Sequence, residues 1–257
     1  MSDFDRNLAT AKTGGYRSDQ IAIDAGLRAY MIRVYNYMAS GVALTGVVAW
    51  LTYQAAGGDA IQVAGGQITG LTSFGQAIFG GPLTIALFLG TLGLVFFMSF
   101  RINRISAGTA LTLFFVYAGL LGLMLASIFL EYTGGSITRV FFISAASFGA
   151  LSLWGYTTQR DLSPMGSFLI MGLFGLIIAM VVQIWLQSPA FNFAISAIGV
   201  LIFAGLTAWD TQKIKEMYDV NDDGTVAGRK AVMGALSLYL DFINLFLMLL
   251  RLMGDRR

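Results

Sequence analysis

Seven apolar stretches, each close to the length of a membrane span, follow one another along this 257-residue chain. They lie at residues 35–54, 82–100, 107–130, 137–156, 165–186, 191–210 and 231–250. A helix needs about 20 apolar residues to cross the hydrocarbon core of a bilayer. The pattern therefore predicts an all-α integral membrane protein, built as a bundle of seven transmembrane helices.

The segment before the first span differs from the rest of the chain. Residues 1–34 are polar and carry charges of both signs, without the short basic start and apolar core of a secretory signal. We expect a cytoplasmic tail that is disordered up to about Gln20 and continues from Ile21 as an interfacial helix. Residues 35–257 then form the transmembrane domain, in which a glycine-rich loop at 55–81 connects the first two spans.

The composition narrows the chemistry that is open to the protein. Charged residues make up 12% of the chain, whereas a soluble domain carries about 25%. The absence of cysteine and histidine excludes disulfides, thiolate metal sites and Ser-His catalysis. The net charge is only +2 and the basic residues are scattered, so no nucleic-acid partner is expected. Any pH sensing must depend on carboxylates, because histidine is the usual sensor near neutral pH.

Basic residues in the loops predict the orientation, because cytoplasmic loops carry an excess of lysine and arginine. The residues on one side are Arg28, Arg33, Arg101, Arg104, Arg160, Lys213, Lys215, Arg229 and Lys230. The opposite loops hold only Arg139, so the amino terminus is expected in the cytoplasm. Seven crossings would place the basic C-terminal residues Arg251, Arg256 and Arg257 on the far side. Either the rule fails at this end of the chain or one segment is re-entrant.

Asp241 lies near the middle of the last apolar stretch. An ionised carboxylate at that depth costs about 3 kcal/mol of insertion free energy. It therefore needs a partner, a water-filled cavity or a proton. Helical spacing places it on one stripe with Gly234, Ser237, Asn244 and Met248. We expect this stripe to face the interior of the bundle, and the other faces to contact lipid or apolar neighbours. The structural alternative is an aspartate satisfied by a helix end, but intramembrane ionisable groups are functional candidates by default.

A second carboxylate, Asp210, ends the sixth apolar stretch. Alone it would be a boundary carboxylate, solvated or paired with Lys213, but its antiparallel neighbour carries Asp241. Two carboxylates in contact share a proton and titrate as a pair. The pair is therefore a candidate pH sensor, and a cation must balance its doubly ionised form. Arg101 and Arg104, at the end of the second span, are the candidates, with headgroup anchoring as their structural alternative.

Three segments carry a family resemblance: GYTTQRDLS at 155–163, TAWDTQKIK at 207–215 and the last span at 236–251. From about Ala25 to its end, the chain resembles the Bax inhibitor-1 family (transmembrane Bax inhibitor motif proteins), specifically the bacterial inner-membrane branch. The resemblance implies a seven-helix fold with the last helix at the centre. It also implies a multi-pass protein of the bacterial inner membrane that acts as a pH-sensitive calcium leak.

The resemblance also assigns roles to residues. Asp210 and Asp241 occupy the positions of the two aspartates that form the sensor and gate, and they are the candidate Ca²⁺ ligands. The arginine that latches the closed state lies at the end of the second span, where Arg101 is our choice and Arg104 the reserve. The family implies no enzymatic activity and no cofactor. The expected partners are the lipid bilayer, Ca²⁺ or H⁺, and a candidate membrane-protein partner.

Two other functions remain as hypotheses. The first is a regulatory protein without ion flux that acts on a membrane protease or stress machinery. The second is an intramembrane aspartyl protease, which also places two aspartates on consecutive helices. Such proteases show a Gly-x-Gly-Asp motif, whereas Leu238-Tyr239-Leu240 precedes Asp241 here.

The loop before the last span invites comparison with a calcium site. Residues 219–226 match the first half of an EF-hand loop, but the twelfth position, which should be a bidentate glutamate, is Lys230. We therefore interpret this segment as a polar, turn-forming cytoplasmic loop.

Overall fold

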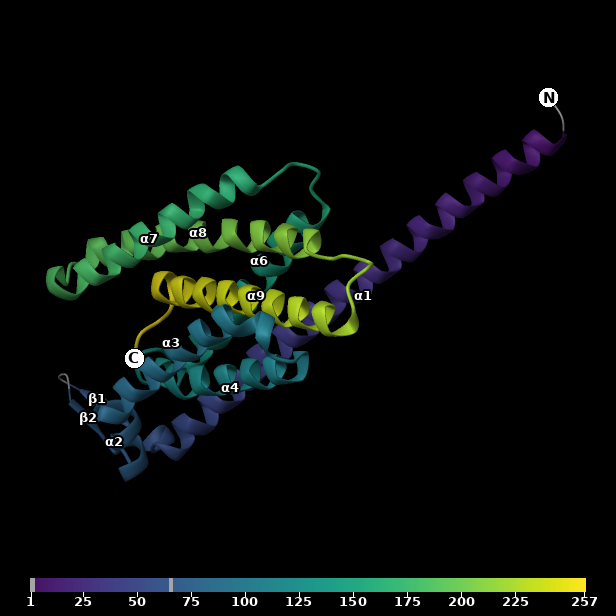
Figure 1. Cartoon of the computed structure of the whole chain (residues 1–257). Helices are drawn as coiled ribbons and strands as arrows, with labels where there is room; N and C mark the ends of the chain where they lie inside the picture. The colour runs from purple at the N-terminus through teal and green to yellow at the C-terminus, as the bar shows by residue number, and fades with distance from the viewer. Residues whose placement is uncertain (1–2, 65–66) are drawn as a thin grey trace.

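Seven long helices dominate the structure, a computed structural model that describes residues 3–64 and 67–257. They are α1 (Asp3–Ala55), α3 (Pro82–Arg101), α4 (Ala107–Leu125), α6 (Gly134–Thr157), α7 (Ser163–Leu186), α8 (Pro189–Glu216) and α9 (Gly224–Met253). Each is long and apolar enough to cross a membrane. The predicted all-α bundle of seven transmembrane helices is confirmed (Figure 1).

The loop between the first two spans is folded rather than open. It contains a 3-10 helix η1 (Gly58–Ala60), the strands β1 (Gln62–Ala64) and β2 (Gln67–Thr69), and the short helix α2 (Ser73–Gly80). The strands pair antiparallel, with Val63 opposite Ile68. Gly70 has φ +81°, and a Cβ there would lie 2.1 Å from the carbonyl oxygen of Ala60. Glycine is therefore required for the chain to turn back against η1.

Two further short helices follow α3 and α4. The 3-10 helix η2 (Ile102–Arg104) follows α3, and α5 (Ile128–Glu131) follows α4. Each extends its apolar span, to Arg104 and to Glu131 respectively.

The first helix differs from our expectation, because α1 is continuous from Asp3 to Ala55. We predicted disorder up to about Gln20. The segment contains no proline, and its alanine, lysine, arginine and leucine residues favour helix. Its apolar part begins at Ala25, before the predicted start of the first span, and its N-terminal part projects beyond the bundle (Figure 1). The boundary between tail and membrane domain stays a prediction.

Helix α9 lies at the centre of the bundle, as the resemblance implies. Of its most apolar stretch, 72% is buried, compared with 6% for α7 and 11% for α3. It packs against α1, α4, α6 and α8. Its fully buried Tyr239 shares a hydrogen bond of 2.6 Å with Thr45 of α1 and lies edge-on against Phe114 of α4. Because neighbours cover α9 on most sides, its apolar faces pack against protein rather than lipid.

The polar stripe that we predicted on α9 divides into two. Gly234, Asp241 and Met248 are buried, whereas Ser237 and Asn244 are half-buried. The half-buried positions of α9 follow their own helical stripe: Met233, Ser237, Leu240, Asn244 and Leu247. Helical spacing places this second stripe beside the one that carries Asp241.

The basic C-terminal tail is held at one end of the bundle by backbone contacts. It leaves α9 at the end of the bundle opposite the α8–α9 loop and pairs with the α5–α6 connection through an antiparallel bridge between Tyr132 and Arg256. The backbone N–H of Thr133 donates to the Asp255 carbonyl at 3.1 Å, and that of Arg257 donates to the Glu131 carbonyl at 3.0 Å. All seven long helices of the described chain cross the bundle, so the tail lies at the end opposite the α8–α9 loop. The orientation of the two ends in the membrane stays a prediction.

Ion pairs accompany these backbone contacts. Arg139 contacts Asp255 at 2.8 Å and Arg256 contacts Glu131 at 3.3 Å. Arg257 donates to the hydroxyl of Tyr53, at the end of α1, at 3.1 Å. One acidic and one basic residue of the tail, Asp255 and Arg256, are thus paired locally.

Candidate functional site

The candidate site lies between α8 and α9, whose close approach depends on two glycines. A Cβ on Gly234 of α9 would come 2.9 Å from Ile214 Cγ2, and a Cβ on Gly199 of α8 would come 2.7 Å from Met248 Sδ. Larger residues at either position would separate the helices. These two contacts fix the antiparallel register, with residue 214 level with 234 and residue 199 level with 248.

This register brings the two candidate aspartates together. Asp241 lies level with residues 206–207 of α8, which is about one turn, or ~5 Å along the axis, from Asp210. The two carboxyl groups are near enough for each to act electrostatically on the other. The sequence placed Asp210 at the end of the sixth apolar stretch. Instead α8 stays helical to Glu216, so Asp210 lies inside the helix.

The surroundings of the pair determine its chemistry. Asp241 is buried, with 5% of its surface exposed, and Asp210 is half-buried. Carboxylates only accept hydrogen bonds when ionised, so a hydrogen bond between the two requires a proton on one of them. Within the part of the chain that the structure describes, Oδ2 of Asp241 is buried without a hydrogen-bond partner. Asp241 therefore presents one buried carboxyl oxygen that has no fixed partner among the described residues.

The predicted latch residues lie apart from this pair. Arg101 ends α3 and Arg104 ends η2, and both side chains are exposed. Among the described residues, no ion pair within 4 Å joins either arginine to Asp210 or Asp241. The structure thus brings together two of the predicted site residues and leaves the latch a prediction.

Two basic residues that we did not assign to the site have more direct contacts with its helices. Lys213 lies one turn beyond Asp210 and acts on its charge, with Nζ 4.8 Å from the centre of the Trp209 ring. Arg229, near the start of α9, donates to the Asn103 carbonyl in η2 at 2.7 Å. Arg229 therefore ties the end of α3 to α9. Its basic character was visible in the sequence, but its backbone partner was not.

Comparison with known proteins identifies the family. The family model described as inhibitor of apoptosis-promoting Bax1 matches residues 27–257. The inner membrane protein YbhL of Escherichia coli is 45% identical over 94% of this chain and 98% of its own length. An uncharacterized protein of Rickettsia prowazekii is 47% identical over the whole of both chains. An uncharacterized membrane protein of Streptococcus pyogenes is 34% identical over 90% of this chain and 94% of its own.

The chain belongs to the Bax inhibitor-1 family. In this member, two of the segments that carried the resemblance pack against each other. A Cβ on Gly155 of α6 would lie 2.1 Å from the Ala208 carbonyl oxygen of α8. The buried side chain of Gln212 donates to the Arg160 carbonyl at 2.8 Å and accepts from the Leu162 N–H at 2.8 Å. These contacts fix α8, and with it Asp210, against α6 and the α6–α7 loop.

The EF-hand-like loop of this family member holds its acidic groups in local contacts. Asp223 accepts from the Val226 N–H at 2.7 Å and caps α9, while Lys230 contacts Asp222 at 2.5 Å. Hydrogen bonds from the backbone N–H and side-chain amide of Asn221 hold the pKa of Asp219 below its usual range. Among the described residues, no group of three or more acidic, histidine or cysteine side chains could hold a metal ion. The loop forms the turn that we expected.

Proposed function

We propose that this protein is a pH-sensitive cation leak channel of the bacterial inner membrane, and that Ca²⁺ is its permeant ion. The proposal rests on the register of α8 and α9, which places Asp210 and Asp241 about one turn apart inside the bundle. Neighbouring aspartates in a membrane are costly unless they hold a proton or a cation. The inner-membrane location is proposed from the printed name of the Escherichia coli relative.

Ca²⁺ enters the proposal as cargo rather than as a resident ligand. Resident calcium sites provide about 6 to 8 oxygen ligands, and two aspartates provide about four oxygens. The unpartnered oxygen of Asp241 supports transient contact with a passing cation. A pathway needs such weak contacts, because an ion that binds too tightly does not leave.

The gating step depends on the proton that the pair shares. When both aspartates are ionised, they repel each other and attract a cation; the guanidinium of Arg101 at the end of α3 would close the path by pairing with them. Protonation removes that attraction and releases Arg101. We assign the structure to the released state, because the side chain of Arg101 is exposed and forms no ion pair with Asp210 or Asp241 among the described residues. The leak should therefore increase as the pH falls.

The test is Ca²⁺ influx into proteoliposomes between pH 6 and pH 8. Wild type is compared with Asp210→Asn and Asp241→Asn, which remove the titrating group and preserve the side-chain shape. Asp219→Asn serves as the matched control, because Asp219 is exposed in the α8–α9 loop. We expect a pH-dependent leak in wild type and in the control, and a flat profile in both pair variants.

Two results would contradict the proposal. Wild-type vesicles that are no leakier than empty liposomes at every pH would exclude a channel and favour the regulatory hypothesis. A pH profile that survives both pair substitutions would exclude the aspartate pair as the sensor. Replacing Arg101 or Arg104 with Gln then distinguishes the latch from its reserve, since only the latch variant should leak at high pH.

A further inference from the structure

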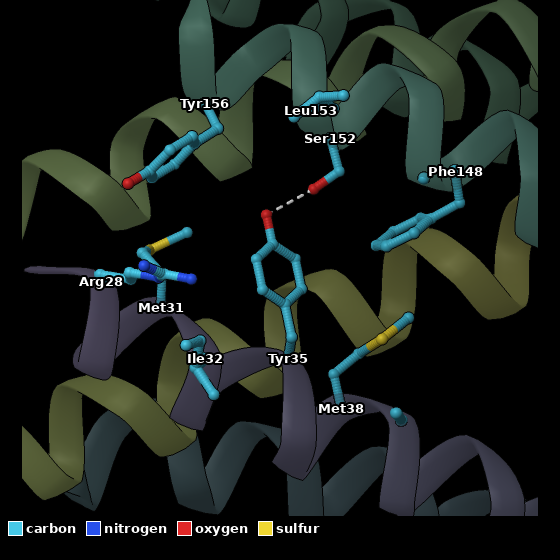
Figure 2. Close-up of a pocket in the computed structure, with 11 residues that line it drawn as sticks. Arg28, Met31, Ile32, Tyr35, Met38, Phe148, Ser152, Leu153 and Tyr156 are labelled. Atoms are coloured by element: carbon cyan, nitrogen blue, oxygen red, sulfur yellow. Dashed lines mark hydrogen bonds between the residues drawn. The ribbon is translucent and has the colours of Figure 1, made fainter.

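A groove of about 770 Å³ opens on the flank of the bundle between α1 and α6 (Figure 2). Its α1 wall includes Arg28, Ile32 and Ala39, and its α6 wall includes Phe148 and Leu153. Most of the lining is apolar, and both walls belong to membrane-spanning segments. The neighbours of this groove in a bilayer are therefore lipid molecules.

Hydroxyl groups at the floor of the groove are already satisfied. Tyr35 reaches across from α1 and shares a hydrogen bond of 2.7 Å with Ser152 of α6 (Figure 2). Ser152 shares another of 2.9 Å with Thr211 of α8, which donates to the Thr207 carbonyl at 2.7 Å. Because these hydroxyls bond to one another, the floor does not need a polar ligand and can contact hydrocarbon.

The length of the groove matches one leaflet. From Arg28 to Ala39, α1 advances about eleven residues, or ~17 Å at about 1.5 Å per residue. Half of the hydrocarbon core measures ~15 Å. Arg28 therefore lies near the level of the headgroups when Ala39 lies near the bilayer midplane.

One end of the groove is basic and the other is apolar. Arg28 and the Tyr156 hydroxyl lie toward one end, whereas Met38 and Phe148 lie toward the other (Figure 2). Lys215 donates to the Tyr156 carbonyl at 2.9 Å, and its Nζ lies 5.3 Å from the centre of the Tyr156 ring. A guanidinium binds phosphate oxygens in a bidentate manner, and basic residues near the membrane surface attract anionic lipids. The charge distribution thus matches a molecule with an anionic head and an apolar chain.

We propose that this groove is a binding site for one anionic phospholipid. Its phosphate contacts Arg28, beside the Tyr156 hydroxyl, and one acyl chain lies along Ile32, Ala39 and Phe148. The site is independent of the proposed channel, because it requires neither Asp210 nor Asp241. It places a lipid against the hydrogen-bonded connection between α1, α6 and α8.

The first test compares two arginines of α1. The full-length protein is purified in detergent, and its complexes with added phosphatidylglycerol or phosphatidylcholine of identical acyl chains are measured by native mass spectrometry. Arg28→Gln should weaken retention of phosphatidylglycerol about fivefold, which is the effect of about one basic residue near a membrane surface. Arg33→Gln is the matched control, because Arg33 is also exposed on α1 but does not line the groove.

The second test fills the groove without changing charge. A Cβ on Gly149 of α6, which lines the groove, meets no atom within 4 Å, and the same holds for Gly93 of α3. Gly149→Phe should therefore reduce lipid retention without a backbone clash, whereas Gly93→Phe should leave it unchanged. Inorganic phosphate, added at the same concentration as the lipid, should not displace bound phosphatidylglycerol from the groove, because the acyl chain contributes most of the contact.

Three results would overturn the proposal. These are equal retention of the two lipids, equal loss in the Arg28 and Arg33 variants, or unchanged retention in Gly149→Phe. Each would mean that lipid covers this flank without a specific site. Because the charge variants and the groove variants act by different physical effects, the failure of one variant to fold leaves the other pair decisive.

Discussion

Charged residues have opposite surroundings at the C-terminal end of the bundle and at the α8–α9 interface. At the C-terminal end, Arg139, Arg256 and Arg257 each contact an acidic group or a tyrosine hydroxyl. At the α8–α9 interface, Asp210 and Asp241 lie about one turn apart, and one buried oxygen of Asp241 has no hydrogen-bond partner among the described residues. The first arrangement stabilises a fixed structure. The second leaves a group that can change its proton or its partner, which is why we assign function to it.

The largest effect should come from separating the helices that position Asp210. Gly155→Ala places a Cβ 2.1 Å from a backbone oxygen of α8, and a rigid backbone cannot yield as a side chain does. We expect destabilisation of about 3 kcal/mol, the upper part of the range for overpacking, measured as thermal unfolding in detergent. Gly149→Ala on the same helix meets open space and should be near neutral. Equal stability of the two variants would show that α6 and α8 are not packed this closely.

An intermediate effect should follow from removing the tail at the opposite end. Deleting residues 255–257 removes two backbone hydrogen bonds and both ion pairs to the α5–α6 region. The ion pairs are exposed and weak, so most of the expected loss of about 2 kcal/mol comes from the backbone bonds. The pH dependence of the leak should be unchanged, as measured in the proteoliposome assay. A changed pH profile would show that this end also takes part in gating.

The smallest effect concerns Asp161 in the α6–α7 loop, at the same end as Arg160 and Gln212. The backbone N–H of Ser163 donates to it at 2.8 Å, and this hydrogen bond holds its pKa below the usual range. A carboxylate with a lowered pKa stabilises the fold above its unfolded pKa of about 3.9, and that contribution is lost as the pH falls through the folded value. Below about pH 4, the free energy of unfolding of Asp161→Asn should therefore fall slightly less with decreasing pH than that of wild type.

A pH series of unfolding curves can also contradict the prediction for Asp161. If unfolding curves of wild type and Asp161→Asn coincide from pH 6 to pH 3, the loop carboxylate does not contribute to acid stability. The comparison of the two ends would then rest on the buried pair alone.

Much of the fold follows from apolar length, because a bilayer admits few structures. The number of spans and the candidate aspartates were visible in the sequence, since a buried carboxylate in an apolar run is exceptional. Helix ends were less predictable. Asp210 was expected at the end of its span, yet α8 continues through Lys213 and Lys215 to Glu216, because charged residues end an apolar pattern without ending a helix.

Contacts between side chains and distant backbone were not predictable at all. Gln212 bonds to the α6–α7 loop and Arg229 bonds to Asn103, but a backbone carbonyl is present at every residue and leaves no mark in the sequence. The groove beside Arg28 was missed for a related reason, since its shape depends on where α1 and α6 separate.

The sequence by itself determined that this chain is a seven-span membrane protein with two aspartates on its last two helices. Hydrophobic length and the cost of a buried charge are properties of single segments, so they can be inferred one segment at a time. Only the tertiary structure decided that Asp210 and Asp241 lie about one helical turn apart, that the tail pairs with the α5–α6 connection and that α9 is covered on most sides. These three features depend on helix register and packing. Gly199 and Gly234, for example, let α8 and α9 approach each other closely. Register is a property of two helices together, so it cannot be inferred from one segment.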